Sequence, residues 1–176
     1  MKIIVDLEAT CCDQGSIPRH EMEIIEIGAV AYDEQAHETI DEISILVKPV
    51  VHPELTGFCK SLTSISQRMV DRGVGFVEAA EGLSDFIASY ECNGFSSWGD
   101  YDKHQLRQDC GRHGVEWAFG DEHENIKKMF ASNMNLRKPC GLGAALRKVD
   151  IDFVGTAHRG IDDARNMARL GPYIWL

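Results

Sequence analysis

An apolar run at the start of the chain ends in two carboxylates, and no other feature constrains the fold as much. Ile3-Ile4-Val5 is followed by Asp6-Leu7-Glu8. On a β-strand, side chains two residues apart point to the same side, so Asp6 and Glu8 would lie together. Two adjacent carboxylates raise each other's pKa unless a cation lies between them. The pattern predicts a first strand whose end holds a hard divalent ion such as Mg²⁺ or Mn²⁺; the alternative is a strand that ends in solvent.

Three more strands are expected. Residues 24–32 are rich in β-branched and small side chains and indicate a buried strand with one acidic interruption, Glu26. Residues 42–48 alternate between apolar and other side chains, which is typical of a third strand. A short strand is predicted at residues 94–98. The first three strands would follow one another as a meander.

The helical signals lie mostly in the second half of the chain. Apolar residues recur with helical spacing over residues 76–90. Thr63 or Ser64 is expected to cap a short helix through Val70. Further helical patterns cover residues 103–112, 122–131, 142–149 and 160–170. Early strands, a later strand and packed helices predict an α/β domain with a mixed sheet, and 176 residues suit a single domain, 1–176.

The net charge of −10 does not exclude a nucleic-acid substrate. Residues 1–100 carry six Lys and Arg against eighteen Asp and Glu, whereas residues 101–176 carry twelve against ten. Two divalent ions bound to an acidic cluster would add four positive charges locally. The chain shows no basic leader and no apolar window approaching the roughly 20 residues of a membrane span, so we expect a cytoplasmic protein without a membrane partner. The six cysteines form no C-x-x-C pair and are expected to be reduced thiols without a role.

Asp163 is the first candidate partner for Asp6 and Glu8. In the predicted helix over residues 160–170, helical spacing places Asp163 beside the apolar face, where an aspartate is costly unless it is paired. The same spacing points Asp162 almost opposite, to the polar side that carries Asn166, and Asp162 is expected to be solvated there. His158 precedes Asp163 by five residues, in the loop that leads into this helix. Because imidazole titrates near neutrality, His158 could take a proton from a water beside a metal cluster.

A fourth carboxylate is expected from the segment Asp100-Tyr101-Asp102, at a junction between strand and helix. Asp102 lies four residues before Leu106, which places it on the inward face of the following helix. Asp100 precedes the helix and would serve a turn or a cap. We therefore expect Asp102 to join the cluster.

These motifs resemble those of the DEDDh branch of 3′-to-5′ exonucleases, and most closely its ERI-1/3′hExo-like (KapD-like) group. The resemblance covers nearly the whole chain, and it rests on four segments in order. They are Asp6-Leu7-Glu8-Ala9-Thr10 with Glu23-Ile24-Ile25-Glu26-Ile27-Gly28, Phe58-Cys59-x-Ser61-Leu62-Thr63-x-Ile65-x-Gln67-x-x-Val70-Asp71, Ser97-Trp98-Gly99-Asp100-Tyr101-Asp102 and His158-Arg159-Gly160-Ile161-Asp162-Asp163.

The resemblance implies a ribonuclease-H-like exonuclease fold, with a mixed five-stranded sheet flanked by helices. It also implies two Mg²⁺ or Mn²⁺ ions held by Asp6, Glu8, Asp102 and Asp163, with His158 as the general base. The implied reaction is hydrolysis of single-stranded RNA or DNA from the 3′ end, with RNA favoured, to release nucleoside 5′-monophosphates. In animal members an additional nucleic-acid-binding domain precedes the nuclease, whereas this sequence starts at the first catalytic strand. Targeting to structured RNA is therefore not expected to carry over.

The resemblance also implies a pocket for the 3′-terminal nucleotide. Phe58 and Tyr101 would flank the terminal base, although Phe58 could instead pack in the core. Ala9 and Thr10 would contact the terminal sugar. Two other functions stay open: a nucleic-acid-binding module without catalysis, and a metal phosphatase that acts on free nucleotides. The first would lack a carboxylate or the histidine; the second would need no groove for stacked bases.

Overall fold

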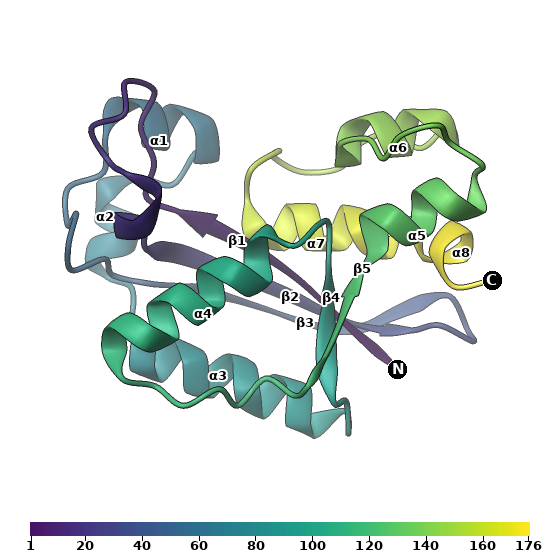
Figure 1. The fold of residues 1–176 in the computed structure, drawn as a ribbon, viewed down its shortest axis with the longest axis horizontal. Coiled ribbons are helices and arrows are strands. Elements are labelled where there is room, and N and C mark those ends of the chain that lie inside the picture. The colour runs from purple at the N-terminus through teal and green to yellow at the C-terminus, as the bar shows by residue number, and fades with distance from the viewer.

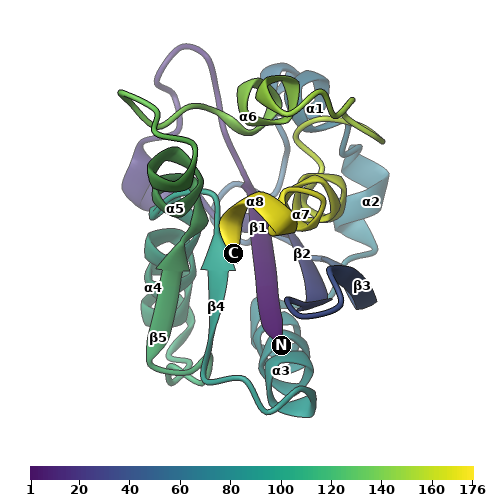
Figure 2. The same ribbon diagram turned by 90° about the vertical axis from the view of Figure 1, so that its right-hand side faces the viewer.

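A computed structural model describes residues 1–176 and shows a single mixed sheet of five strands (Figure 1). The strands are β1 (Lys2–Ala9), β2 (Ile24–Asp33), β3 (Glu38–Leu46), β4 (Gly94–Ser97) and β5 (Glu122–Asn125), in the spatial order β3-β2-β1-β4-β5. The first three strands pair antiparallel, whereas β4 runs parallel to β1 and β5 parallel to β4. The predicted mixed five-stranded sheet is confirmed, and β1 is its central strand (Figure 2).

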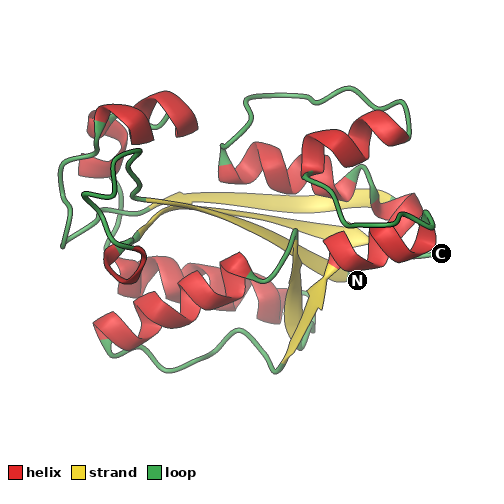
Figure 3. Ribbon diagram, turned by 45° about the horizontal axis from the view of Figure 1, so that its top comes forward, coloured by secondary structure: helices red, strands yellow, loops and turns green.

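Helices cover both faces of this sheet (Figure 3). They are α1 (Gly57–Thr63), α2 (Gln67–Asp71), α3 (Phe76–Ser89), α4 (Tyr101–His113), α5 (Ile126–Asn133), α6 (Leu142–Lys148), α7 (Gly160–Ala168) and α8 (Gly171–Ile174), with a short 3₁₀ turn at Arg19–Glu21. One core cluster joins the sheet to α3 and α4, and a second joins the opposite face to α5, α6, α7 and α8. None of these helices is long and apolar enough to cross a membrane.

The alternation of side chains along β1 decides where its carboxylates point. Ile3, Val5 and Leu7 are buried in the core cluster beneath α3 and α4. Ile4 belongs to the opposite cluster, which contains the apolar residues of α7. Asp6 and Glu8 follow Ile4 at intervals of two residues, so they face the side of the sheet on which α7 lies.

The expected short helix through Val70 is present as α2, but neither Thr63 nor Ser64 caps it. The Thr56 side chain accepts a hydrogen bond from Cys59 N, so α1 begins earlier, at Gly57. Ser64 has a left-handed backbone with φ of 59° and ends α1 instead of starting a helix. The next helix, α2, starts only at Gln67. Thr63 and Ser64 therefore mark the end of α1 and not the start of α2.

The helix expected over residues 122–131 begins four residues late. Residues 122–125 form β5, whose register with β4 runs from Gly94↔Glu122 to Ser97↔Asn125. These four polar residues have only a weak preference for strands, and they form one because they pair with β4. The Asn125 side chain accepts a hydrogen bond from Lys128 N over 3.1 Å and caps α5. Strand β3 also begins earlier than expected, at Glu38, while the helix expected over residues 76–90 matches α3 closely.

Candidate active site

Four carboxylates and a histidine gather at the end of β1 that carries Asp6 and Glu8. Together they line one cavity of about 580 Å³. The charged residues in its wall are Asp6, Glu8, Asp102, His158 and Asp163. They come from the central strand, from the first turn of α4, from the loop before α7 and from α7 itself. Every charged residue that the sequence predicted for the cluster therefore lies in this cavity.

Asp102 is held directly against β1. Its side chain is 5% exposed, and its Oδ1 accepts a hydrogen bond of 3.0 Å from Leu7 N. Asp100 lies elsewhere: its carboxylate forms an ion pair with Lys128 at 3.2 Å and does not line the cavity. Asp100 is the residue before α4, but its side chain makes no cap hydrogen bond. The expected placement of Asp102 matches the structure, while the expected turn or cap role of Asp100 is replaced by the ion pair.

His158 and Asp163 are fixed relative to each other by the backbone. His158 N donates a 2.8 Å hydrogen bond to Asp163 Oδ2. Glu8, His158 and Asp163 each offer a ligand atom, and these three atoms lie within 4.8 Å of one another. His158 itself is exposed and has a left-handed backbone, with φ of 62°. The imidazole therefore lies at the open side of the carboxylate cluster.

Burial dominates the electrostatics of the cluster. It raises the pKa of Asp6 well above its usual range, with further contributions from the charges of Asp102 and Glu8. It also raises the pKa of Glu8 to about 8, helped by the nearby Asp163 charge. Burial raises the pKa of Asp102 and of Asp163 to about 6 each. Because a cation favours the charged form of a carboxylate, this set of oxygen ligands suits one or more hard divalent ions.

Asp162, expected to be solvated, is only partly exposed, and Asn166 on the same side of α7 is buried. Asp162 accepts hydrogen bonds from Thr156 N at 2.8 Å and from Arg165 Nη1 at 2.9 Å. Asn166 is fully buried, and it bonds to both the N–H and the carbonyl of Val154. The loop before α7 folds back over this side of the helix, so the polar face of α7 is a packing surface. Helical spacing gave the direction of each side chain but could not foresee this cover.

Of the two aromatic residues expected to flank a base, only Tyr101 lines the cavity. The Tyr101 hydroxyl lies 3.3 Å from Gln105 Oε1, and the Arg19 guanidinium lies over the ring at 5.4 Å from its centroid. Phe58 is 38% exposed on α1 and is not part of the core, so the alternative of core packing is wrong. Phe58 also lies outside the cavity wall, so its contact with a base stays a prediction.

The side chain of Thr10 is already engaged. Thr10 is 1% exposed, and its hydroxyl accepts a hydrogen bond from Glu23 N over 2.9 Å. The Ala9 carbonyl lies 3.7 Å from Cys59 Sγ. A contact from Ala9 or Thr10 to a terminal sugar stays a prediction; the Thr10 hydroxyl, which accepts from Glu23 N, keeps its own O–H to donate.

Four apolar residues of the cavity wall were not predicted from the sequence: Trp98, Leu142, Phe153 and Ala157. Trp98 precedes the Gly99-Asp100-Tyr101-Asp102 segment, and its indole N–H donates to the Cys140 carbonyl over 3.0 Å. Trp98 directly follows β4, so this bond links the end of β4 to the segment before α6. Leu142 is the first residue of α6. Only the adjacency of Trp98 to Asp102 could have suggested it from sequence, because Leu142 and Phe153 reach the site through tertiary packing.

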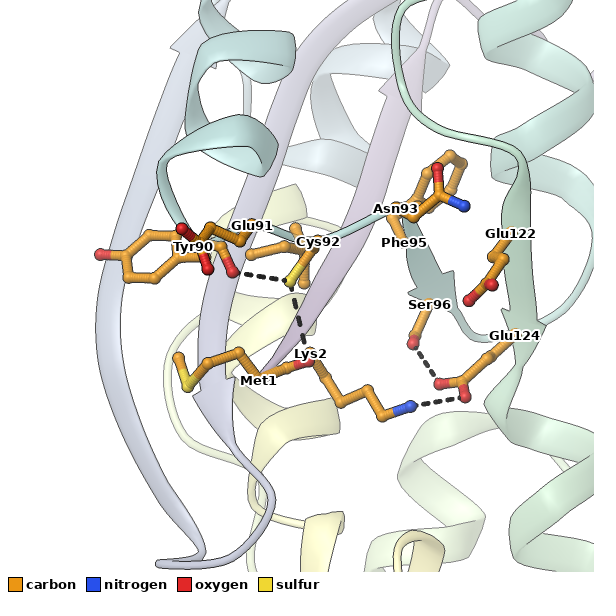
Figure 4. Close-up of a pocket in the computed structure, with 12 residues that line it drawn as sticks. Met1, Lys2, Tyr90, Glu91, Cys92, Asn93, Phe95, Ser96, Glu122 and Glu124 are labelled. Atoms are coloured by element: carbon orange, nitrogen blue, oxygen red, sulfur yellow. Dashed lines mark hydrogen bonds and ion pairs between the residues drawn. The ribbon is translucent and has the colours of Figure 1, made fainter.

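A second cavity, of about 420 Å³, lies at the opposite end of β1 and is lined by the starts of β1 and β4 (Figure 4). Three polar side chains of its wall pair with one another. Lys2 Nζ lies 2.7 Å from Glu124 Oε1, and Ser96 Oγ donates to Glu124 Oε2 over 2.9 Å. None of the five charged residues of the first cavity takes part, so the candidate active site is confined to the other end of the strand.

The sheet order and the helices on its two faces define a ribonuclease-H-like exonuclease fold. The nuclease domain of 3′hExo, a DEDDh family member solved with bound rAMP, matches with a TM-score of 0.88 at 29% identity, covering 97% of this chain and 88% of that structure. The full-length 3′-exonuclease also matches with a TM-score of 0.88 at 29% identity, over 97% of this chain and 58% of that one. The predicted fold is confirmed.

More particularly, the chain belongs to the RNase_T family, described as Exonuclease, whose model matches residues 3–170. Human ERI1 exoribonuclease 2 is 32% identical over 96% of this chain, and human ERI1 exoribonuclease 3 is 31% identical over 96%. The predicted relationship to ERI-1/3′hExo-like exonucleases is therefore confirmed. The chain spans 27% of the first relative and 51% of the second, about half or less of their lengths.

Proposed function

We propose that residues 1–176 form a single 3′-to-5′ exonuclease domain that acts on single-stranded nucleic acid and releases nucleoside 5′-monophosphates. One observation carries the proposal: Asp6, Glu8, Asp102, Asp163 and His158 line the same cavity. The preference for RNA over DNA rests on the relatives, which are named exoribonucleases. A cytoplasmic location stays a prediction from the sequence.

The four carboxylates would hold two Mg²⁺ or Mn²⁺ ions. Ions bound there would lower the pKa of the attacking water and neutralise charge on the leaving 3′ oxygen. Burial raises the pKa of Glu8 and of Asp163, so these carboxylates ionise less readily when no cation is near. A divalent ion would favour their charged form, which supports this role. Leu7 N and His158 N each donate to one carboxylate of the set, which fixes the orientation of Asp102 and Asp163.

His158 would accept the proton of the attacking water on a ring nitrogen and pass it to solvent. Its exposed position at the rim of the cavity supports this role, because the imidazole can exchange protons with bulk water. The hydrogen bond from its backbone to Asp163 leaves the ring free. On this proposal Tyr101 and Phe58 flank the terminal base, and Ala9 and Thr10 lie against the terminal sugar.

The test uses 5′-labelled RNA and DNA oligomers of equal sequence with Mg²⁺ or Mn²⁺. A 3′-to-5′ exonuclease shortens the labelled strand one nucleotide at a time, releases 5′-monophosphates and leaves a circular oligomer intact. Internal cleavage of the circle would contradict the proposal. Binding of the oligomer without hydrolysis would instead identify a non-catalytic module. Faster turnover of a nucleotide monoester than of the oligomer would identify a phosphatase.

A further inference from the structure

A fifth buried carboxylate lies directly behind the cluster but outside the cavity wall. Glu26 of β2 is 0% exposed and pairs across the sheet with Glu8 of β1. A carboxylate removed from water is costly unless hydrogen bonds and an opposite charge compensate it. The partners of Glu26 therefore show what its burial achieves.

All the partners of Glu26 except one belong to the start of α7. Its Oε2 accepts hydrogen bonds from Arg159 Nε at 3.0 Å and from Gly160 N at 2.9 Å. Its Oε1 accepts from Arg159 Nη2 at 3.1 Å and from Ser44 Oγ of β3 at 3.0 Å. The two bonds from the guanidinium form a bidentate fork, which fixes angle as well as distance. Glu26 therefore holds both the side chain and the backbone of the residues that open α7.

The clamped residues lie between the two groups that complete the active site. Arg159 follows His158 directly, and Asp163 N donates to the Arg159 carbonyl over 2.8 Å. His158 N in turn bonds to Asp163 Oδ2. Arg159 is therefore a pivot: a movement of its backbone would carry both His158 and Asp163 with it.

Two glycines allow the start of α7 to lie directly against the sheet. A Cβ placed on Gly28 would lie 2.1 Å from the carbonyl carbon of Gly160, and a Cβ on Gly160 would lie 2.9 Å from Asp6 O. The start of α7 thus contacts the backbones of β1 and β2 without intervening side chains. His158, just before this start, has a left-handed backbone. This conformation is uncommon and is maintained only where several contacts with the surrounding structure fix it.

We propose that Glu26 and Arg159 are a positioning pair that sets His158 and Asp163 at their working distance from Glu8. This inference rests on the proposed function for its role in catalysis. It concerns positioning and not stability: loss of one partner of a buried ion pair destabilises a fold, so activity is compared with the melting temperature of each variant. Neither residue lines the cavity, so they act through the residues that they hold.

A matched control is present in the same helix. The Arg165–Glu42 ion pair also links α7 to the sheet, through β3, but both its side chains are partly exposed, at 45% and 38%. The control variant is Glu42→Gln, and the test variants are Glu26→Gln and Arg159→Lys. Glu26→Gln removes the negative charge with little change of shape. Arg159→Lys keeps the positive charge but cannot form the bidentate pair of hydrogen bonds.

The first measurement is single-strand hydrolysis at a temperature well below the melting point of each variant. We expect Glu26→Gln to lower kcat roughly 10–100-fold with KM nearly unchanged, the usual effect of losing a group that orients a metal ligand. Arg159→Lys should lower kcat less than Glu26→Gln does, and Glu42→Gln should keep a kcat near that of wild type. Equal losses in Glu26→Gln and Glu42→Gln that follow their melting temperatures would overturn the proposal.

The second measurement needs no turnover: Mn²⁺ affinity, determined by calorimetry on each protein without substrate. Weaker binding by roughly 10-fold in Glu26→Gln, with Glu42→Gln unchanged, supports the positioning pair. Wild-type Mn²⁺ affinity and wild-type kcat in a folded Arg159→Lys protein would refute it, even if Glu26→Gln fails to fold. If the wild type binds Mn²⁺ but hydrolyses no oligomer, the proposed function fails, and this affinity comparison still decides the role of the pair.

Discussion

Leu7 N donates a 3.0 Å hydrogen bond to Asp102 Oδ1, which joins the first turn of α4 to the central strand. The donor lies on β1 between Asp6 and Glu8, so the bond brings Asp102 within reach of both. Through this one contact, a helix 95 positions later in the sequence supplies a carboxylate to the cluster. Asp102 is thus an acceptor for Leu7 N, and in the proposed function it also supplies a charge to a metal ion.

We expect Asp102→Asn to abolish hydrolysis while the protein stays folded. The amide oxygen of Asn can still accept the hydrogen bond from Leu7 N, but it brings no charge to the metal site. Because burial raises the pKa of Asp102 to about 6, loss of that charge should not lower the melting temperature of the metal-free protein. Activity on single-stranded RNA and the melting temperature are measured together.

The control for this prediction is Asp100→Ala, which should retain most activity. Asp100 is paired with Lys128 on the surface and has no contact with the cavity. Full activity in Asp102→Asn, combined with loss in Asp100→Ala, would show that the second motif has been assigned to the wrong aspartate.

The stability of the metal-free protein should fall as pH rises, because of Glu8. Its pKa is raised from 4.5 to about 8, so the folded state holds a proton that the unfolded state releases between these values. For a carboxylate raised in this way, the folded state is penalised progressively from about pH 4.5 upward and fully above about pH 8. The melting temperature of wild type should therefore drop across this window, and Glu8→Gln should drop less.

Mn²⁺ should reverse this loss at pH 8, since a bound cation favours the ionised carboxylate. The measurement is a series of thermal melts with chelator and with Mn²⁺. A wild-type slope identical to that of Glu8→Gln would remove Glu8 as the source of the pH dependence.

His158→Asn should lower kcat by roughly 10²–10⁴-fold, the usual value of a positioned general base, with little change in substrate affinity. Asn tolerates the left-handed backbone found at His158, and its backbone N–H can still bond to Asp163. Because a general base must be unprotonated to act, the wild-type rate should rise with pH, and the variant should lose that rise. An unchanged pH profile in the variant would exclude the general-base role.

Three carboxylates of the candidate site could be predicted because a local conflict marks each of them. Asp6 and Glu8 are charges at the end of an apolar strand, and Asp163 is a charge at the apolar edge of a helix. Glu26 shows the same conflict, a charge inside a buried strand, but the sequence pattern alone indicates no role for it. Its partner Arg159 lies 133 positions away, and no local pattern links the two.

The elements that could not be predicted depend on tertiary contacts in the same way. Strand β5 consists of Glu122-His123-Glu124-Asn125, which has the composition of a helix or loop and becomes a strand only by pairing with β4. Asn166 falls on the polar side of α7 by helical spacing, yet the backbone of Val154 covers it. The strands and helices with strong apolar periodicity, such as α3, were predictable because burial alone selects their faces.

The last prediction concerns the form of the substrate: single-stranded 3′ ends should be digested, and a blunt duplex should resist. A terminal base held against Tyr101 in the cavity must leave its stack, which costs a duplex a few kcal/mol and a single strand much less. Phe58→Ala tests the second face of this clamp. Phe58 is 38% exposed, so the variant should keep its melting temperature, while KM for single-stranded RNA rises roughly tenfold through the lost stacking. Val77→Ala on α3, also exposed, is the matched control and should change neither quantity. An unchanged KM in Phe58→Ala would remove Phe58 from the pocket, and equal rates on blunt duplex and single strand would exclude a terminal-base pocket altogether.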